Sequence, residues 1–229
     1  MLVARSHRMT PVDDIRRGDI VKVWDPRSDR FLKRIFIVLS NERFHRNGRD
    51  EVQVVEIWRP YKPTPVVRTR IKRLGSVFEA KPGVFEQIAR EMRDYISPGS
   101  YDELADGRSR PGAQLWLDVT FSDGRNFETH PVVVVSRPLL FNAHDVLFFM
   151  DMSTGAPNQV DYVLERPTRI GSFVKARLFW VDRREMELYN KDRNPPGLQL
   201  ADLLGSVNAL DRVLELDCSP AWQQLVKPE

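Results

Sequence analysis

The chain has 229 residues, of which 41% are hydrophobic and 29% charged, so it can bury a core and is a little long for one average domain. Its formal net charge is +3, and no apolar run reaches the length of a secretory leader or a membrane span. We therefore expect a cytoplasmic protein without a membrane partner. The single Cys218 excludes an internal disulfide, and four scattered histidines give no zinc-binding spacing, so no metal or cofactor is predicted.

Charge is unevenly distributed along the chain. Residues 1–108 carry 22 Lys and Arg against 16 Asp and Glu, whereas residues 109–229 carry 13 against 16. Because Lys and Arg neutralise phosphates, the amino half is the better candidate for holding a nucleic acid backbone. A solvated basic surface without a ligand is an alternative explanation of the same excess.

Three strands are predicted in the amino half. Alternating apolar and polar residues predict the first over 18–24, and apolar runs predict the next two over 34–41 and 51–58. Residues 66–73 alternate basic with apolar or small side chains, which is typical of an edge strand with a cationic outer face. The apolar periodicity of residues 82–96 predicts a helix that closes this part of the chain.

The same order of elements then occurs a second time. Residues 97–110, with Ser-Pro-Gly and Asp-Gly steps, have the composition of a linker. Strands are predicted over 111–119, 131–136 and 146–153, with spacings close to those of the first set. A Leu-rich helix is predicted over 200–216. An internal repeat of this kind governs the prediction of the fold.

Each half carries the same ordered set of short motifs. The first reads Arg17-Gly18-Asp19-Ile20-Val21, then Arg34-x-x-Ile-Val-Leu-Ser40-Asn41, then a hydrophobic strand ending at Ile57. The second reads Pro111-Gly112, then His130-Pro131 with four valines and Ser136, then Met152-Ser153. This set resembles the pattern of the MazF/PemK/Kid family of bacterial toxin endoribonucleases. The resemblance covers most of 17–57 and 111–217 and leaves 59–110 unaligned.

The resemblance implies a mainly β protein with peripheral helices, an α+β chain made of two small SH3-like barrels of the MazF or CcdB type. The first barrel would span residues 12–96 and the second 111–217, with 97–110 as the linker. Because the family's barrel dimerises, the two copies would form a pseudo-dimer within one chain, which could then be monomeric.

The resemblance also implies a chemistry, the cleavage of single-stranded RNA without metal by attack of the ribose 2′-hydroxyl. This reaction needs a group that takes the hydroxyl proton, and donors for the charge that develops on the phosphate. By resemblance, the family uses an Arg at the start of the second strand and a Thr or Ser at the end of the third. The first copy has Arg34 but Trp58 at the hydroxyl position, and the second has Ser153 but His130 in place of Arg.

Three interpretations of this divided set remain open. In the first, His130 and Ser153 form a working catalytic pair, and Arg34 stabilises charge across the interface between the copies. In the second, the site is lost and the chain binds RNA or another partner without cutting it. In the third, these residues are ordinary polar strand ends. Trp58 is either a platform on which an RNA base stacks or a plain core residue.

Basic residues of the loops and of the predicted edge strand complete the candidate RNA-binding surface. They are Arg27, Arg30, Lys33, Arg125, Arg68 and Arg70. Cationic side chains on an edge strand also protect it from aggregation, which explains Arg68 and Arg70 without RNA.

The leading hypothesis is a toxin-like, metal-independent endoribonuclease from a bacterial toxin–antitoxin system. Its substrate would be single-stranded RNA, and a small antitoxin protein would hold it inactive. The alternative is a catalytically degenerate MazF- or CcdB-like module that binds RNA, acts as a regulator or targets gyrase.

Overall fold

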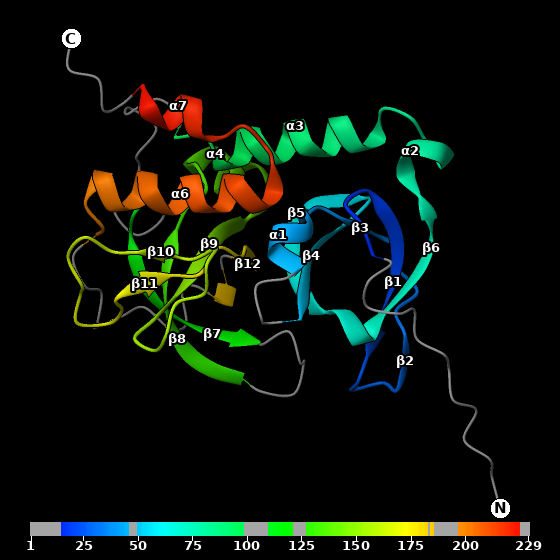
Figure 1. Cartoon of the computed structure of the whole chain (residues 1–229), viewed down its shortest axis with the longest axis horizontal. Coiled ribbons are helices and arrows are strands. Elements are labelled where there is room, and N and C mark those ends of the chain that lie inside the picture. Colours follow the sequence, from blue (N-terminus) through cyan, green and yellow to red (C-terminus); the bar gives the residue numbers. More distant parts are fainter. Residues whose placement is uncertain are drawn as a thin grey trace, which may run out of the picture.

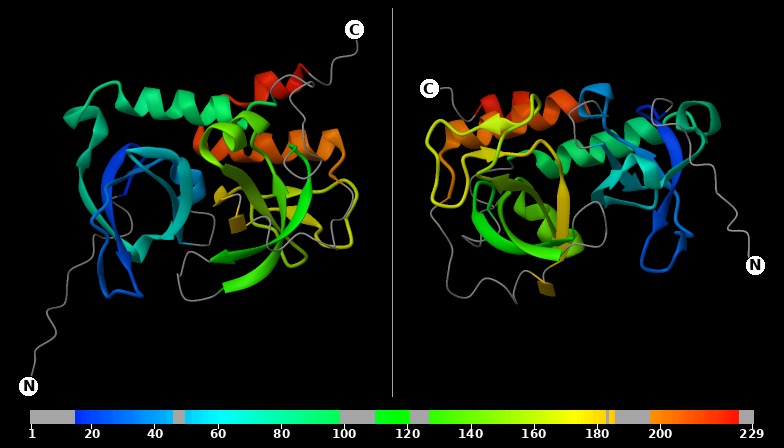
Figure 2. Two further views of the ribbon diagram at one scale, coloured as in Figure 1. Left: turned by 180° about the vertical axis from the view of Figure 1, so that it is seen from behind. Right: turned by 60° about the horizontal axis from the view of Figure 1, so that its bottom comes forward.

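The structure is a computed structural model that describes residues 15–45, 50–98, 110–120, 127–182, 184–185 and 197–224. It contains two antiparallel sheets that lie side by side, with the longer helices gathered along one end of both (Figures 1 and 2). The prediction of a mainly β chain with peripheral helices is confirmed. Most of the predicted linker, residues 99–109, lies outside the described residues.

The first unit, residues 15–98, holds a six-stranded sheet. Its strands are β1 (Asp19–Asp25), β2 (Arg30–Phe31), β3 (Phe36–Val38), β4 (Glu51–Glu56), β5 (Arg59–Val67) and β6 (Ile71–Ser76). The sheet order is β2-β1-β3-β4-β5, and β6 also pairs with β1. The helices of this unit are α1 (Glu42–His45), α2 (Val77–Ala80) and α3 (Val84–Ile96).

The predicted edge strand over 66–73 is interrupted. β5 ends at Val67, a 3-10 turn, η2, covers Arg68–Arg70, and β6 begins at Ile71. Because β5 and β6 lie at opposite edges of the sheet and only three residues join them, the sheet has to curl until its edges approach. Figure 2 shows this curvature. In the described residues no β5–β6 pairing closes the sheet, so the predicted barrel is a strongly curved open sheet.

The second unit, residues 110–224, holds the other six-stranded sheet. Its strands are β7 (Gln114–Thr120), β8 (Phe127–Val134), β9 (Val146–Ser153), β10 (Tyr162–Val163), β11 (Phe173–Val174) and β12 (Phe179–Asp182). The order is β10-β11-β9-β8-β7, and β12 also pairs with β9. The helices are α4 (Pro138–His144), α6 (Leu200–Leu214) and α7 (Ser219–Gln223).

A glycine turn opens the first strand of each unit in the same way. Gly18 N donates to Val38 O at 2.8 Å, and Gly112 N donates to Val134 O at 2.8 Å. The φ angles of these two glycines are 82° and 85°, a left-handed backbone that a side chain at Cβ disfavours. Equivalent turns therefore use glycine for the same physical reason in both units.

A buried serine joins the next two strands of each unit. Ser40 Oγ accepts a hydrogen bond from Gln53 N at 2.9 Å, and Ser136 Oγ accepts one from Phe148 N at 2.9 Å. Both serines are fully buried, and a short helix, α1 or α4, follows each of them. The two units thus share local detail and a three-strand order, β1-β3-β4 in the first and β7-β8-β9 in the second, whereas their remaining strands are arranged differently.

Apolar side chains form three buried clusters. Two lie inside the curved sheets and include, in turn, Val21, Val38 and Val54 of the first unit and Leu115, Val132 and Phe149 of the second. The third and largest includes Ile37 and Val55 from the first sheet, Phe148 and Met150 from the second, and residues of α3, α6 and α7. Because this cluster crosses from one unit to the other, the units share one core beneath the helices.

The closing helix of the second unit ends against the first unit. The last carbonyls of a helix have no partner within it. Here Arg17 Nη2 donates to Leu214 O at 2.7 Å, and Asn41 N donates to Val213 O at 2.8 Å. The described helices include none that is both long and apolar enough to span a membrane.

Candidate functional site

His130 and Ser153 lie on two neighbouring strands of the second unit, β8 and β9. The pairing of these strands ends with Val132 opposite Asp151. His130 itself pairs with Leu117 of β7, and Ser153 pairs with Phe173 of β11. Both residues are partly exposed. If the β8–β9 register continued for two more residues, His130 would lie opposite Ser153 on the same face of the sheet, so a pairing of the imidazole with the hydroxyl stays a prediction.

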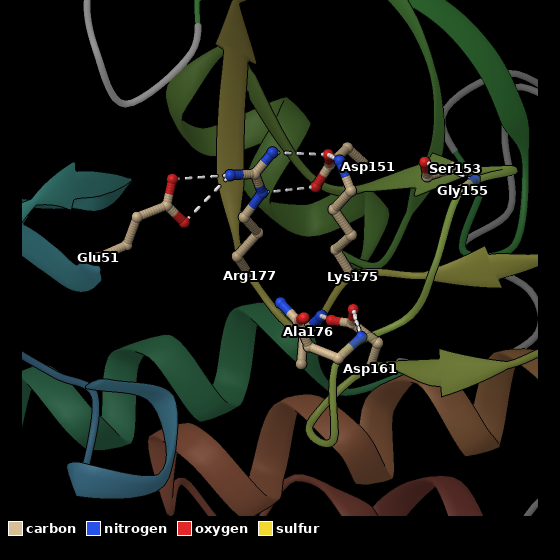
Figure 3. Close-up of polar contacts among 9 residues, drawn as sticks. Glu51, Asp151, Ser153, Gly155, Asp161, Lys175, Ala176 and Arg177 are labelled. Carbon is tan, nitrogen blue, oxygen red and sulfur yellow. Dashed lines mark hydrogen bonds and ion pairs between the residues drawn. The ribbon is translucent and has the colours of Figure 1, made fainter. Parts of the chain in front are cut away.

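Asp151 and Lys175 lie near Ser153. The carboxylate of Asp151 is fully buried, and Lys175 Nζ is 2.8 Å from its Oδ2 (Figure 3). Phe173 of β11 is opposite Ser153, and Lys175 N donates to Asp151 O at 2.9 Å, so Lys175 is across from Asp151. Its side chain is 14% exposed. We call His130, Asp151, Ser153 and Lys175 the second-unit rim, which thus contains an ammonium that the sequence analysis missed.

Arg177 connects the second-unit rim to the first unit. Its Nε and Nη2 donate to the two carboxylate oxygens of Asp151 at 2.9 and 2.8 Å. Its Nη1 donates to both oxygens of Glu51, in β4, at 2.9 and 3.0 Å (Figure 3). All three side chains are 5% exposed or less, and each charge has an opposite partner, which buried ions require.

The electrostatics of this network hold Asp151 in its charged form. Burial raises the pKa of its carboxyl, but the charges and hydrogen bonds of Arg177 and then Lys175 lower it by more, to well below the ordinary value. Burial lowers the pKa of Arg177, while Asp151 and Glu51 raise it by more. A carboxylate that holds a proton so weakly is a poor general base, so Asp151 is suited to orienting Lys175 rather than to removing a proton.

A side-chain amide makes a second buried connection between the units. Gln53 Nε2 donates to Leu178 O at 2.8 Å, and Leu178 N donates to Gln53 Oε1 at 3.0 Å. The amide thereby satisfies one donor and one acceptor of the opposite backbone. Together with Arg177, it fixes the segment that follows Lys175 against β4.

The first unit has different residues at the equivalent place. β3 and β4 pair with Phe36 opposite Glu56, Arg34 precedes β3, and Trp58 lies in the turn that follows β4. Arg34 Nη1 is 3.2 Å from Glu56 Oε2, and the Arg34 side chain is 56% exposed. Trp58 is 74% exposed, so it is not a core residue.

Arg34 and the Asp151 network contact opposite ends of β4. Arg34 binds Glu56 at the end of β4, whereas the Asp151 network reaches Glu51 at its beginning. The five steps of extended chain between those two glutamates span about 17 Å. The sharing of one site by Arg34, His130 and Ser153 stays a prediction.

The other predicted RNA-binding residues differ in exposure. Arg27, Arg30 and Lys33 are exposed in and after the turn between β1 and β2. Arg68 is buried, and its Nη1 donates to His45 O at 3.2 Å, so the expectation of a surface role for it is corrected. Arg70 is partly exposed within η2.

One predicted residue, Arg125, lies outside the described residues. Within the described ranges, no three His, Cys, Asp or Glu side chains gather in a way that could hold a metal ion.

Comparison with known proteins gives a weak likeness. No protein-family model and no curated protein matches the sequence. Two crystal structures of MazE–MazF from Deinococcus radiodurans, Form-II and Form-III, resemble part of it, both at 15% identity. The first match covers 47% of this chain and 96% of that chain with a TM-score of 0.38, and the second 44% and 92% with a TM-score of 0.36. Likeness of this size does not place the chain in a family.

Proposed function

We propose that the chain is a toxin-like, metal-independent endoribonuclease that cleaves single-stranded RNA at the second-unit rim. The observation that carries the proposal is the ion pair of Lys175 with the buried Asp151, which stands two residues before Ser153 in β9 and opposite Val132, two residues after His130 in β8. An imidazole titrates near neutral pH and can accept a proton, a hydroxyl can donate to a phosphate oxygen, and an ammonium can stabilise negative charge.

In the proposed reaction, neutral His130 takes the proton of a ribose 2′-hydroxyl, and the 2′-oxygen attacks the adjacent phosphorus. The bond from phosphorus to the 5′-oxygen breaks, and that oxygen takes a proton from solvent. The products are a 2′,3′-cyclic phosphate and a 5′-hydroxyl end. Ser153 and Lys175 stabilise the charge that builds on the non-bridging oxygens, and Asp151 holds Lys175 in place.

We also propose that the two units arose as tandem copies and form an intramolecular pseudo-dimer. The matched turns at Gly18 and Gly112 and the matched serines at positions 40 and 136 support this. So does the shared core beneath the helices. A small inhibitory protein that covers the second-unit rim belongs to the same proposal. Co-expression with the product of a short neighbouring gene should yield a complex that leaves RNA intact.

The test is cleavage of a labelled single-stranded RNA by the purified chain in the presence of EDTA. We expect cyclic-phosphate ends, and we expect Ser153→Ala and His130→Ala each to reduce the rate at least about 100-fold. Thr154→Ala, which removes the exposed hydroxyl next to Ser153, is the matched control and should cleave normally. Intact RNA after incubation with the wild-type chain would refute the proposed activity.

A second candidate function, RNA binding without cleavage, is favoured by the first unit. There the hydroxyl position is taken by the exposed Trp58, and Arg34 is held by Glu56. If the wild-type chain retards RNA in a native gel but leaves it intact, this candidate replaces the endoribonuclease.

A further inference from the structure

Trp58 lies at the centre of an exposed, cationic part of the first unit. It lies in the short turn between β4 and β5, and Arg59 follows it directly. The Nζ atom of Lys81, just after α2, lies 5.3 Å from the centroid of the Trp58 ring. Arg34 pairs with Glu56, the last residue of β4, two positions before Trp58. We call Trp58, Arg34, Arg59 and Lys81 the Trp58 surface.

The exposure of Trp58 requires an explanation, because an indole is a large apolar group. Its exposed fraction of 74% exceeds that of every other large hydrophobic residue for which the structure records exposure. Packing within the chain therefore does not account for its presence. A planar ring that remains in solvent is suited to stacking against another planar group.

The charges around Trp58 favour an anionic partner. Arg34, Arg59 and Lys81 are exposed cations. Glu56 lies beside them, but it is buried and already pairs with Arg34. The same cations affect the neighbouring Lys62. Its pKa is lowered first by burial and then by the charge of Arg59.

We propose that the Trp58 surface is a second RNA subsite, in which an unpaired base stacks on Trp58 while Arg59 and Lys81 contact the flanking phosphates. Proteins that hold single strands combine these two features, an aromatic platform and cations along the backbone. The subsite binds and does not cut, because it has no hydroxyl at the equivalent of Ser153. This inference deepens the proposed function and rests on it for the identity of the ligand.

The position of the subsite predicts the length of RNA that uses it. Arg34 of the Trp58 surface pairs at the end of β4, whereas the second-unit rim connects to the beginning of β4 through Arg177. These two ends are about 17 Å apart along the strand. A dinucleotide is too short to occupy both places, so only longer RNA gains affinity from Trp58.

The first arm of the test measures binding without cleavage. In the full-length chain carrying Ser153→Ala, fluorescence anisotropy with a labelled single-stranded RNA should show about tenfold weaker binding after Trp58→Ala. Trp58→Phe should retain most of the affinity. Val163→Ala, at an exposed apolar residue of β10, is the control and should bind normally. Unchanged affinity in Trp58→Ala would overturn the subsite.

The second arm measures the salt dependence of the same binding. Arg59→Gln and Lys81→Gln should each reduce the slope of log affinity against log salt concentration by about one. Unchanged slopes in both variants would mean that Arg59 and Lys81 do not contact phosphates. If Trp58→Ala instead abolishes binding of an acidic protein partner and leaves RNA affinity unchanged, the surface is a protein-docking site and the inference fails.

The third arm separates this inference from the proposed function. In the cleaving wild-type background, Trp58→Ala should raise KM for long RNA about tenfold with kcat unchanged, and should leave dinucleotide cleavage unaffected. RNA that is bound in a Trp58-dependent way but never cut would refute the endoribonuclease and keep the subsite. If the Trp58→Ala variant cleaves long RNA with an unchanged KM, the subsite is refuted and the endoribonuclease is kept.

Discussion

The two units use the same strand register to present different chemistry at equivalent places. In the first, the half-exposed Arg34 pairs with the buried Glu56, two positions before the exposed Trp58. In the second, Asp151 is fully buried and binds Arg177 and Lys175, two positions before Ser153. The comparison teaches that one carboxylate position can support either a single ion pair with a half-exposed cation or a fully buried network, depending on which cations reach it.

The largest effect should come from breaking the buried network. Arg177→Met leaves Glu51 and Asp151 buried without their shared partner, so we expect a loss of about 3–5 kcal/mol in the free energy of unfolding. Arg34→Met, at the half-exposed ion pair of the first unit, should cost no more than about 1 kcal/mol. Urea denaturation of both variants measures the difference. Equal losses in the free energy of unfolding would mean that the buried network contributes no more to stability than the ion pair of the first unit.

The second prediction concerns acid and the first unit. His45 is buried, and its Nε2 is 2.9 Å from Ser40 Oγ. Burial, and then the charge of Arg68, lower its pKa from 6.5 to about 4. The unfolded chain therefore binds this proton first, so the stabilisation is complete above pH 6.5 and is lost as the pH falls towards 4.

The free energy lost in this way should be no more than about 3.5 kcal/mol. His45→Gln should make the stability curve flatter between these two pH values, and denaturation at several pH values measures it. A wild-type chain whose stability does not change between pH 6.5 and 4 would contradict this account of His45.

The third prediction concerns Lys175. Lys175→Met should lower the rate of RNA cleavage about 100-fold, because it removes the cation beside Ser153. The fold should persist, since Arg177 still pairs with Asp151. Lys62→Met, which removes an ammonium that lies 3.8 Å from the ring centroid of Trp180, is the control and should leave kcat unchanged. Normal cleavage by the Lys175 variant would assign that residue to structure alone.

Local patterns were enough to predict several of the strands, although β2 and most of β5 were missed. Alternating side chains marked β1, and the glycines at positions 18 and 112 marked equivalent turns, because both features depend on neighbouring residues only. The break at η2 was missed because nothing in the alternation of residues 66–73 distinguishes the buried Arg68 from an exposed cation.

The buried ion network of Glu51, Asp151 and Arg177 could not be predicted from the sequence, for another reason. Glu51 and Arg177 are 126 positions apart, and only the packing of the two units brings them together. One signal was available, since Lys175 and Arg177 stand two residues apart in an otherwise apolar segment, and both bind Asp151 from the connection between β11 and β12. The closeness of His130 to Ser153 and their roles in catalysis stay predictions.

The smallest expected effect is the change in the free energy of unfolding on Trp58→Ala. It tests directly whether the exposed residue of the first unit contributes to the fold. Because the side chain is 74% exposed, Trp58→Ala should change the free energy of unfolding by no more than about 0.5 kcal/mol. Trp222 of α7, which is buried and donates from Nε1 to Ile96 O at 2.7 Å, is the contrasting case, and its replacement by Ala should cost about 3–5 kcal/mol. Thermal and urea denaturation of the two variants measure these two losses in the free energy of unfolding. A large loss at Trp58 would mean that the indole contributes to the fold, whereas a negligible loss together with weakened RNA binding leaves ligand binding as the reason for its exposure.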